Sequence, residues 1–254
     1  MLTISKTDSR REIDASNIQT RELNQLLKHY AAEGANTIIL RNVCGQRYIG
    51  TDINKKIVIE VHGTPGNDLG SFMNGPTIIV HGNAQDGCGN TMNEGEIIVH
   101  GHAGDITGLS ARGGSIFIRE GVGYRAGIHM KEYGDKKPVM VIGGTAQDFF
   151  GEYMAGGVIV LLGLNLRENE LHQARYIGTG MHGGAIYIRG RVDKYQLGKE
   201  VGMTSPESDD MRLIEALVER FSNYFNMDAE KILKQKFIKL SPLYLRPYGR
   251  LYAY

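Results

Sequence analysis

A chain of 254 residues with 29 basic and 28 acidic side chains carries a formal net charge of +1. This balance gives no long-range attraction to nucleic acid or to an acidic membrane surface, and no apolar run is long enough for a membrane-spanning helix. The polar N-terminal stretch lacks the apolar segment of a secretory signal, so we expect a cytoplasmic protein. Glycine occurs 34 times and proline six times, which indicates repeated tight corners.

Two elements are expected before the repeats begin. The pattern over residues 17–34 predicts an amphipathic helix that is capped by Asn17 and ends at Gly34. Its apolar face consists of Leu23, Leu26, Leu27 and Tyr30. A short strand is expected over residues 37–40. Together, residues 1–41 are expected to cap the N-terminal strand edge of the repeat array.

A five-residue sequence motif recurs in the middle of the chain. Ile-Ile-Val-His-Gly occupies residues 78–82 and returns at 97–101, with related copies at 59–63 and 116–119. Its apolar residues alternate with the period of two that belongs to β-strands. If each copy forms one coil, Ile78 and Val80 point inward and stack on their counterparts. The residues expected to face outward are Glu60, Ile79, Ile98, Phe117 and Tyr187.

Glycine marks a second recurring position. Seven glycines follow one another at spacings of 20, 19, 19, 19, 24 and 27 residues: Gly50, Gly70, Gly89, Gly108, Gly127, Gly151 and Gly178. Methionine or alanine comes three residues later in each copy except the first, which has Ile53. Glycine tolerates the positive φ or the close approach of a corner, and methionine fills irregular space. The pattern predicts a parallel β-helix of about seven coils over residues 42–192.

Two charged inserts lengthen the repeat, one at residues 132–137 and one at residues 167–170. Both are expected to project from an edge of the solenoid. Repeat proteins often place binding loops in such insertions, and a tolerated surface bulge is the other interpretation. The sequence leaves both open.

The C-terminal segment, residues 193–254, has a different pattern. Apolar spacing predicts a helix over residues 208–226 and a shorter one over residues 228–237, which are expected to cap the C-terminal end. The tail from Leu240 onward is aromatic and basic. Tyrosine and arginine often anchor protein interfaces, so four tail residues are candidate partner contacts: Tyr244, Arg246, Tyr248 and Arg250.

Three histidines share one repeat position, and stacking would make His62, His81 and His100 a ladder. Neighbouring imidazoles can bind a metal ion. The fourth position is Arg119, and no carboxylate or cysteine occupies an equivalent place nearby. An ordinary ladder of like residues is therefore favoured, and no metal-binding, cofactor-binding or catalytic residue is assigned.

Acidic residues share another repeat position, with Asp86, Asp105 and Asp148 in the slot that Asn67 fills earlier. Paired carboxylates on a solenoid could cleave polysaccharides. Asn67 cannot act as an acid, so the role of turn formation is favoured. The two cysteines, Cys44 and Cys88, are expected to be buried reduced thiols.

The glycine rhythm, the segment Asn-Ala-Gln-Asp-Gly at 83–87 through Gly95, and Ile-His-Met-Lys-Glu-Tyr at 128–133 resemble the GXGXG domain. That domain closes the large subunit of glutamate synthase and also forms one of the subunits of formylmethanofuran dehydrogenase. The resemblance covers roughly residues 45–190 and implies a right-handed β-helix without catalytic residues. In glutamate synthase, other domains hydrolyse glutamine and bind FMN and an iron–sulfur cluster.

The resemblance implies a scaffold within an oxidoreductase complex, inactive by itself. A glutamine amidotransferase chain and an FMN- and iron–sulfur-containing synthase chain are the expected partners. Leu2 follows Met1, so no N-terminal cysteine nucleophile is expected, and two cysteines are too few for a cluster. The GXGXG subunit of a formylmethanofuran dehydrogenase and a free-standing carbohydrate-active enzyme are the alternatives. Self-association into a homo-oligomer is also considered.

Overall fold

The computed structural model describes residues 9–244. Its strands are β1 (Arg10–Asp14), β2 (Thr37–Cys44), β3 (Val58–Thr64), β4 (Asn74–Val80), β5 (Glu94–Val99), β6 (Ser115–Ile118), β7 (Val139–Ile142), β8 (Ala155–Leu161), β9 (Gly183–Arg189), β10 (Val201–Thr204) and β11 (Phe237–Pro242). Its helices are α1 (Thr20–Ala32), the 3-10 helix η1 (Lys194–Gln196), α2 (Ser208–Phe225) and α3 (Ala229–Leu233). None of the helices in this part of the chain is both long and apolar enough to cross a membrane.

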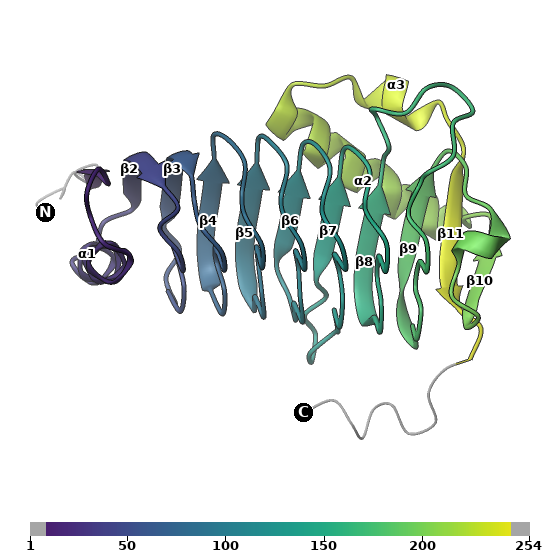
Figure 1. Cartoon of the computed structure of the whole chain (residues 1–254), viewed down its shortest axis with the longest axis horizontal. Helices are drawn as coiled ribbons and strands as arrows, with labels where there is room; N and C mark the ends of the chain where they lie inside the picture. The colour runs from purple at the N-terminus through teal and green to yellow at the C-terminus, as the bar shows by residue number, and fades with distance from the viewer. Residues whose placement is uncertain (1–8, 245–254) are drawn as a thin grey trace, which may run out of the picture.

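The strands stack into one elongated parallel solenoid (Figure 1). Strands β1 to β9 pair in sequence order, each parallel to its neighbour. The solenoid has about six turns, so the expected count of seven coils is not confirmed. The two numbers differ because the predicted coils were counted from seven corner glycines, and seven glycines enclose only six repeat intervals. The handedness and the domain bounds stay predictions.

Branched and apolar residues form continuous columns inside the solenoid, as the alternation predicts. Ile59, Ile78, Ile97 and Ile116 are paired rung by rung across β3 to β6, and each is at most 2% exposed. A second column has Val61, Val80, Val99 and Ile118, all fully buried. Burial of such a side chain stabilises the folded state by about 1.5–3 kcal/mol. These columns therefore provide much of the stabilisation of the solenoid.

The repeat glycines make the corner at which consecutive coils come closest. All seven have φ between 66° and 79°. At Gly89, an added Cβ would overlap Cδ1 of Ile116 from the coil beyond, and at Gly151 it would lie 2.5 Å from Cδ1 of Ile186. The methionines three residues later are at most 1% exposed, which confirms that they point inward. Both expected reasons for glycine, positive φ and close approach, therefore hold.

Left-handed backbone also flanks these glycines. The residues two before and two after them have positive φ as well, including β-branched Ile106 at 50° and Thr91 at 52°. This alternation turns successive N–H groups in opposite directions along the stack. Gly89 N donates to Leu69 O of the preceding coil at 2.8 Å, whereas Thr91 N donates to Leu109 O of the following coil at 2.7 Å. Each corner is thus hydrogen-bonded to the coils on both sides.

Helix α1 lies at the N-terminal end of the stack (Figure 1). Its residues Leu23 and Leu27 are fully buried and belong to the same apolar core as the interior columns. The helix is preceded by Gln19, and Asn17 lies outside it with φ of 63°, so the predicted cap residue is wrong. The helix itself is correctly predicted, whereas a capping function for it is not confirmed.

Helix α2 packs along the flank of the solenoid instead of at its end (Figure 1). Its apolar residues form a second core with the outer side chains of β5 to β9, including Ile98, Phe117 and Tyr187. Those three were expected to face outward and do so, yet they are at most 3% exposed because α2 covers them. Glu96 of β5 accepts hydrogen bonds from Arg220 and Tyr224 of α2 and fixes the helix on this face.

Strands, and not a helix, complete the C-terminal end of the sheet. Strand β11 pairs antiparallel with β9, and β10 pairs antiparallel with β11. The predicted helix over residues 228–237 is therefore too long, since α3 ends at Leu233 and Phe237 begins β11. Asp210 of α2 binds both Lys239 Nζ, at 2.8 Å, and the Tyr187 hydroxyl, at 2.6 Å. Burial and then this hydrogen bond raise the pKa of Tyr187 well above its usual value.

The two cysteines differ in environment, and the expectation that both are buried is wrong for one of them. Cys88 is fully buried in the interior column that precedes the repeat glycines. Burial raises the pKa of its thiol to about 12. Cys44, the last residue of β2, is exposed. Cys44 follows the buried Val43 and lies on the other, exposed side of the strand.

We predict that Ile98→Asp and Val99→Asp both lower the free energy of unfolding by about 3 kcal/mol or more, because each buries an unpaired carboxylate. Ile79→Asp is the matched control on the same outer column, where the side chain is only partly buried. Its loss should be clearly smaller. Urea unfolding followed by circular dichroism measures all three, and an unchanged midpoint for Ile98→Asp would contradict the packing of α2 on this face.

We predict that Gly89→Ala destabilises the protein more than Gly108→Ala. Both substitutions place alanine in left-handed backbone, at a cost of about 1–2 kcal/mol. Gly89→Ala adds overlap with Ile116, whereas the nearest atom at Gly108 is Met140 Sδ at 3.4 Å. Overpacking adds about 1–3 kcal/mol. Thermal unfolding of the two variants gives the difference, and equal melting temperatures would argue against close approach at the corner.

We predict that one thiol per folded chain reacts with Ellman's reagent at pH 8, and that it belongs to Cys44. The Cys88 thiol is buried and protonated at this pH because its pKa is raised to about 12. Cys44→Ser should abolish the fast reaction, and urea should expose a second reactive thiol in the unaltered chain. Rapid labelling of folded Cys44→Ser would show that the interior column is open to solvent.

Candidate functional site

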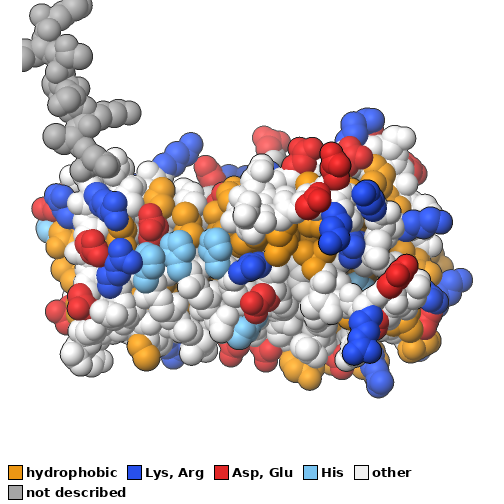
Figure 2. Space-filling view, turned by 90° about the horizontal axis from the view of Figure 1, so that it is seen from above, with side chains coloured by type: hydrophobic (Ala, Val, Ile, Leu, Met, Phe, Trp, Pro, Cys, Tyr) orange, Lys and Arg blue, Asp and Glu red, His pale blue; other side chains and the backbone are white. Residues whose placement is uncertain are grey.

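The three histidines of the repeated five-residue motif form the predicted ladder on the outer face of the solenoid. The imidazole rings of His62 and His81 are stacked with centroids 4.3 Å apart, and those of His81 and His100 are 5.4 Å apart. Figure 2 shows histidine side chains in a row on this surface. The ladder ends against α2, where the ring of Phe225 meets His100 edge-on at 5.2 Å. The helix therefore covers one end of the ladder and leaves the other accessible.

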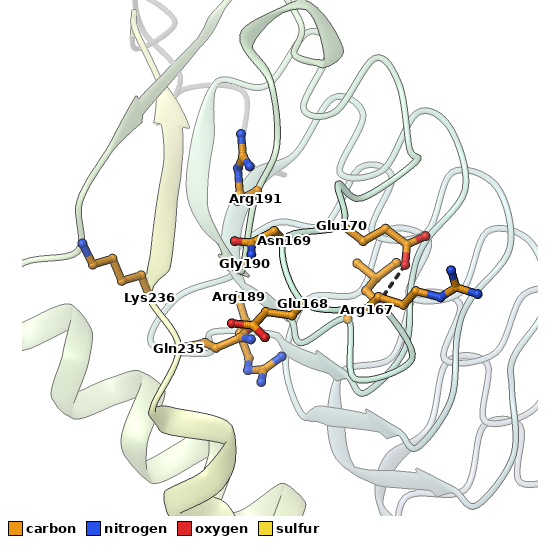
Figure 3. A pocket seen from close by; sticks show the side chains of 11 residues that line it. Arg167, Glu168, Asn169, Glu170, Arg189, Gly190, Arg191, Gln235 and Lys236 are labelled. Atoms are coloured by element: carbon orange, nitrogen blue, oxygen red, sulfur yellow. Dashed lines mark hydrogen bonds between the residues drawn. The ribbon is translucent and has the colours of Figure 1, made fainter.

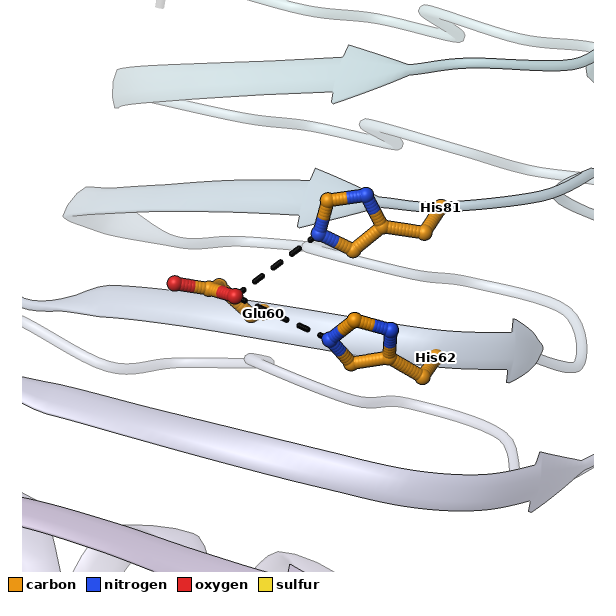
Figure 4. A group of neighbouring side chains, drawn as sticks. All are labelled: Glu60, His62 and His81. Carbon is orange, nitrogen blue, oxygen red and sulfur yellow. Dashed lines mark ion pairs between the residues drawn. The ribbon is translucent and has the colours of Figure 1, made fainter.

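A carboxylate lies at the accessible end. Glu60 and His62 point to the same outer face because they are two residues apart on β3, and His81 follows β4 directly. The Nε2 atoms of His62 and His81 are each 3.7 Å from Oε2 of Glu60, which lies beside the two stacked rings (Figure 4). One donor atom from each of the three residues falls within 4.8 Å of the others. This arrangement could hold a metal ion.

The sequence analysis considered carboxylates only at positions equivalent to the histidines and therefore did not identify Glu60. Glu60 occupies the slot two residues earlier on the same strand as His62, and not the histidine slot of a neighbouring coil. The sequence does carry a signal for this residue: Glu60 is charged, whereas the equivalent outer residues on β4, β5 and β6 are Ile79, Ile98 and Phe117. Of the three strands that lead into the ladder histidines, only β3 has a carboxylate two residues before its histidine.

Burial disfavours the charged form of two histidines of the ladder. Burial first, then the nearby His81 and Arg41, lower the pKa of His62 below its usual value. Its Nε2 is shielded from solvent and has no hydrogen-bond partner among residues 9–244. Burial also lowers the pKa of His100, followed by His81 and Arg119. Neutral imidazoles retain a lone pair that can bind a metal or accept a proton.

The acidic repeat position has a structural role. Asp86 Oδ1 accepts a hydrogen bond from Asp105 N at 2.9 Å, and Asp105 Oδ1 accepts one from Tyr124 N at 2.8 Å. Asp148 Oδ1 does the same for Arg175 N at 2.8 Å. Each carboxylate thus binds backbone in the next coil, whereas sequence reasoning expected it to bind its own turn. A polysaccharide-cleaving mechanism would need these carboxylates as acid and base, but here they hold the backbone of the next coil.

The insert at residues 167–170 forms one wall of a hollow of about 290 Å³ (Figure 3). Arg189 and Arg191 from the end of β9 and Lys236 from the approach to β11 lie across from it. Arg189 is committed to structure, because its Nε donates to Ile232 O at 2.9 Å and its Nη1 donates to Leu162 O at 3.2 Å. The lining mixes both charges and shows no single ligand preference.

The insert at residues 132–137 folds back on the solenoid. Lys136 Nζ lies 3.1 Å from Glu94 Oε2, and Lys137 Nζ lies 3.5 Å from Glu132 Oε1. Tyr133 is exposed. The expectation that one or both inserts bind a partner stays a prediction. Of the tail residues proposed as partner contacts, Tyr244 is 78% exposed, whereas Arg246, Tyr248 and Arg250 lie outside the described residues.

Aromatic side chains form two stacked columns along the corner edge, which sequence reasoning did not predict. Phe149 and Tyr176 stack with ring centroids 4.8 Å apart, and the guanidinium of Arg125 lies 5.0 Å from the Phe149 ring. In the second column, His129 stacks on Tyr153 at 5.3 Å. These residues stand two before or two after repeat glycines. The aromatic residues that recur at those two repeat positions could have revealed the columns in the sequence. Their left-handed backbone turns the side chains outward.

An ion pair between the half-exposed Arg125 and a buried carboxylate joins the two columns. Glu152 lies between them in sequence, and its side chain is only 7% exposed. Its Oε2 accepts a hydrogen bond from Arg125 Nη1 at 2.8 Å. Tyr153 and Tyr176 remain exposed on either side. The result is a rigid aromatic and cationic surface, which we call the aromatic edge and define as Arg125, His129, Phe149, Tyr153 and Tyr176.

Comparisons with known proteins agree with this architecture. The family described as GXGXG motif matches residues 32–245 of the chain. An uncharacterized protein of Methanocaldococcus jannaschii is 51% identical over 249 residues, which are 95% of this chain and 95% of that protein. The alignment with this relative includes the whole repeat region and both flanking helical segments.

Proposed function

Because the chain belongs to the GXGXG motif family, we propose that it is a non-catalytic structural subunit of a glutamate synthase-like complex. In this proposal, a separate chain carries the glutamine amidotransferase, and another carries the FMN and the iron–sulfur cluster. The complex would serve nitrogen assimilation. The present chain would bind no cofactor of that reaction and would hold the catalytic chains at a fixed separation.

The solid interior of the solenoid supports this proposal. The inner columns consist of apolar side chains that are almost completely buried, and such a rod resists bending because every coil is hydrogen-bonded to both neighbours. The repeated acidic residues are held by backbone N–H groups of the next coil. This commitment argues against the alternative of a carbohydrate-cleaving enzyme.

The aromatic edge is the observation that carries the proposal. Tyrosine and arginine are the residues that most often dominate binding energy at protein interfaces. Here they are held in place before any partner arrives, because Tyr176 stacks on Phe149 and Arg125 is fixed by Glu152. Binding to such a preorganised surface loses little side-chain entropy. We place the contact with the partner chains on this edge, with the exposed Tyr244 and the tail that follows it as a second contact.

We predict that a tagged chain purified from its source organism brings with it an FMN-containing chain and glutaminase activity, whereas the isolated chain is colourless and inactive. The double variant Tyr153→Ser with Tyr176→Ser should weaken this association at least tenfold, since interface anchors contribute about 2 kcal/mol or more. The readouts are flavin absorbance, glutaminase assay and mass spectrometry of the purified complex.

Tyr48→Ser provides the matched control, because Tyr48 stands two residues before the first repeat glycine, the slot that Tyr176 fills before the last one. Its side chain is 42% exposed, and it lies near the N-terminal end of the stack, away from the aromatic edge. The substitution should leave the association unchanged. Purification with a molybdopterin-containing chain would favour a formylmethanofuran dehydrogenase-type complex instead. Full association of the double variant would exclude the aromatic edge as the docking surface.

A further inference from the structure

The first rung of the histidine ladder has the composition of a metal site. We propose that Glu60, His62 and His81 together bind a divalent transition-metal ion such as Zn²⁺ on the outer face of β3 and β4. This inference is independent of the scaffold function, because none of these residues belongs to the aromatic edge. It revises the sequence-based expectation that the ladder is only a stack of like residues.

The donor atoms already converge. Both imidazole Nε2 atoms are 3.7 Å from the same carboxylate oxygen of Glu60. Zinc–ligand bonds of about 2.0–2.1 Å in a tetrahedron place neighbouring donors about 3.3 Å apart. Small rotations of exposed side chains close this difference, since His81 and Glu60 are 37% and 32% exposed. The β-sheet backbone can therefore stay fixed while the metal binds.

The His62 nitrogen provides independent support. Its Nε2 is shielded from solvent and lacks a hydrogen-bond partner within the described part of the chain, and 3.7 Å from Glu60 exceeds hydrogen-bond length. A buried polar atom left in this way destabilises the fold, because it has lost its water without gaining a partner. A metal ion between His62, His81 and Glu60 would satisfy that nitrogen. Hydrogen bonding inside the cluster does not do so.

The ligand chemistry selects the class of ion. Two imidazoles with one carboxylate suit zinc, copper, nickel or iron, whereas calcium and magnesium prefer oxygen ligands in larger numbers. Arg41, a cation whose charge acts on His62, is itself held by Glu12, with Nε 2.8 Å from Oε1. Three protein ligands would leave the fourth tetrahedral position open to water. Because the ligands come from two coils, bound metal would also cross-link β3 to β4.

The test is a zinc titration of the metal-stripped full-length chain by isothermal calorimetry, with cobalt absorption as an independent report of coordination. We expect saturation at one ion per chain and a rise in melting temperature. Glu60→Gln, His62→Gln and His81→Gln should each weaken zinc binding at least about 10-fold, because even residues that only support a metal ligand contribute about 10–100-fold to affinity. Each variant is first shown to be folded by circular dichroism.

Two controls separate this site from general histidine binding. His100→Gln removes the third member of the ladder, and His102→Gln removes an exposed histidine in the same coil. Both should bind zinc within about twofold of the unaltered chain, since neither contributes a ligand. The proposal is overturned if the titration is flat, if His62→Gln or Glu60→Gln binds zinc normally, or if His100→Gln loses as much affinity as His81→Gln.

Discussion

The close approach of consecutive coils at the repeat glycines is the constraint on which the structure depends. Strands of a parallel stack lie about 4.8 Å apart, so any side chain that projects along the stack axis meets the coil beyond it. At most of these corners, glycine leaves room for the δ-methyl of an isoleucine from the coil beyond. At Gly108 the facing side chain is Met140, whose unbranched chain leaves more space. Corner and interior are thus adjusted to each other.

This constraint also shapes the outer surface. The left-handed residues around each glycine point their side chains outward at regular intervals, and any ring placed there stacks on the ring of the next coil. The aromatic edge and the histidine ladder both form because equivalent positions of successive coils lie above one another. The proposed metal site lies where one coil departs from the repeat. There Glu60 replaces the isoleucine found in the same outer position on β4 and β5.

The repeat geometry could be predicted from the sequence because each part has a short-range steric cause. Period-two alternation determines which side chains enter the core, and Gly-x-x-Met spacing determines where the corner lies. The position of α2 could not be derived in this way. Its apolar stripe shows that the helix must pack against an apolar surface. The apolar outer residues Phe117 and Tyr187 form that surface, but the sequence predicted only that they face outward. Strand β11 was missed because Phe237 to Leu240 follows a helix closely and its alternation is short.

The order of the elements has a consequence for synthesis on the ribosome. Each parallel coil pairs with the one made just before it, so the solenoid can be assembled progressively as the chain emerges. The outer strip formed by Ile98, Phe117 and Tyr187 is covered only by α2, which ends at Phe225. For much of translation this strip is bare, and an exposed apolar strip on a growing sheet invites association with neighbouring nascent chains. Synthesis and docking of α2 therefore remove this risk of association.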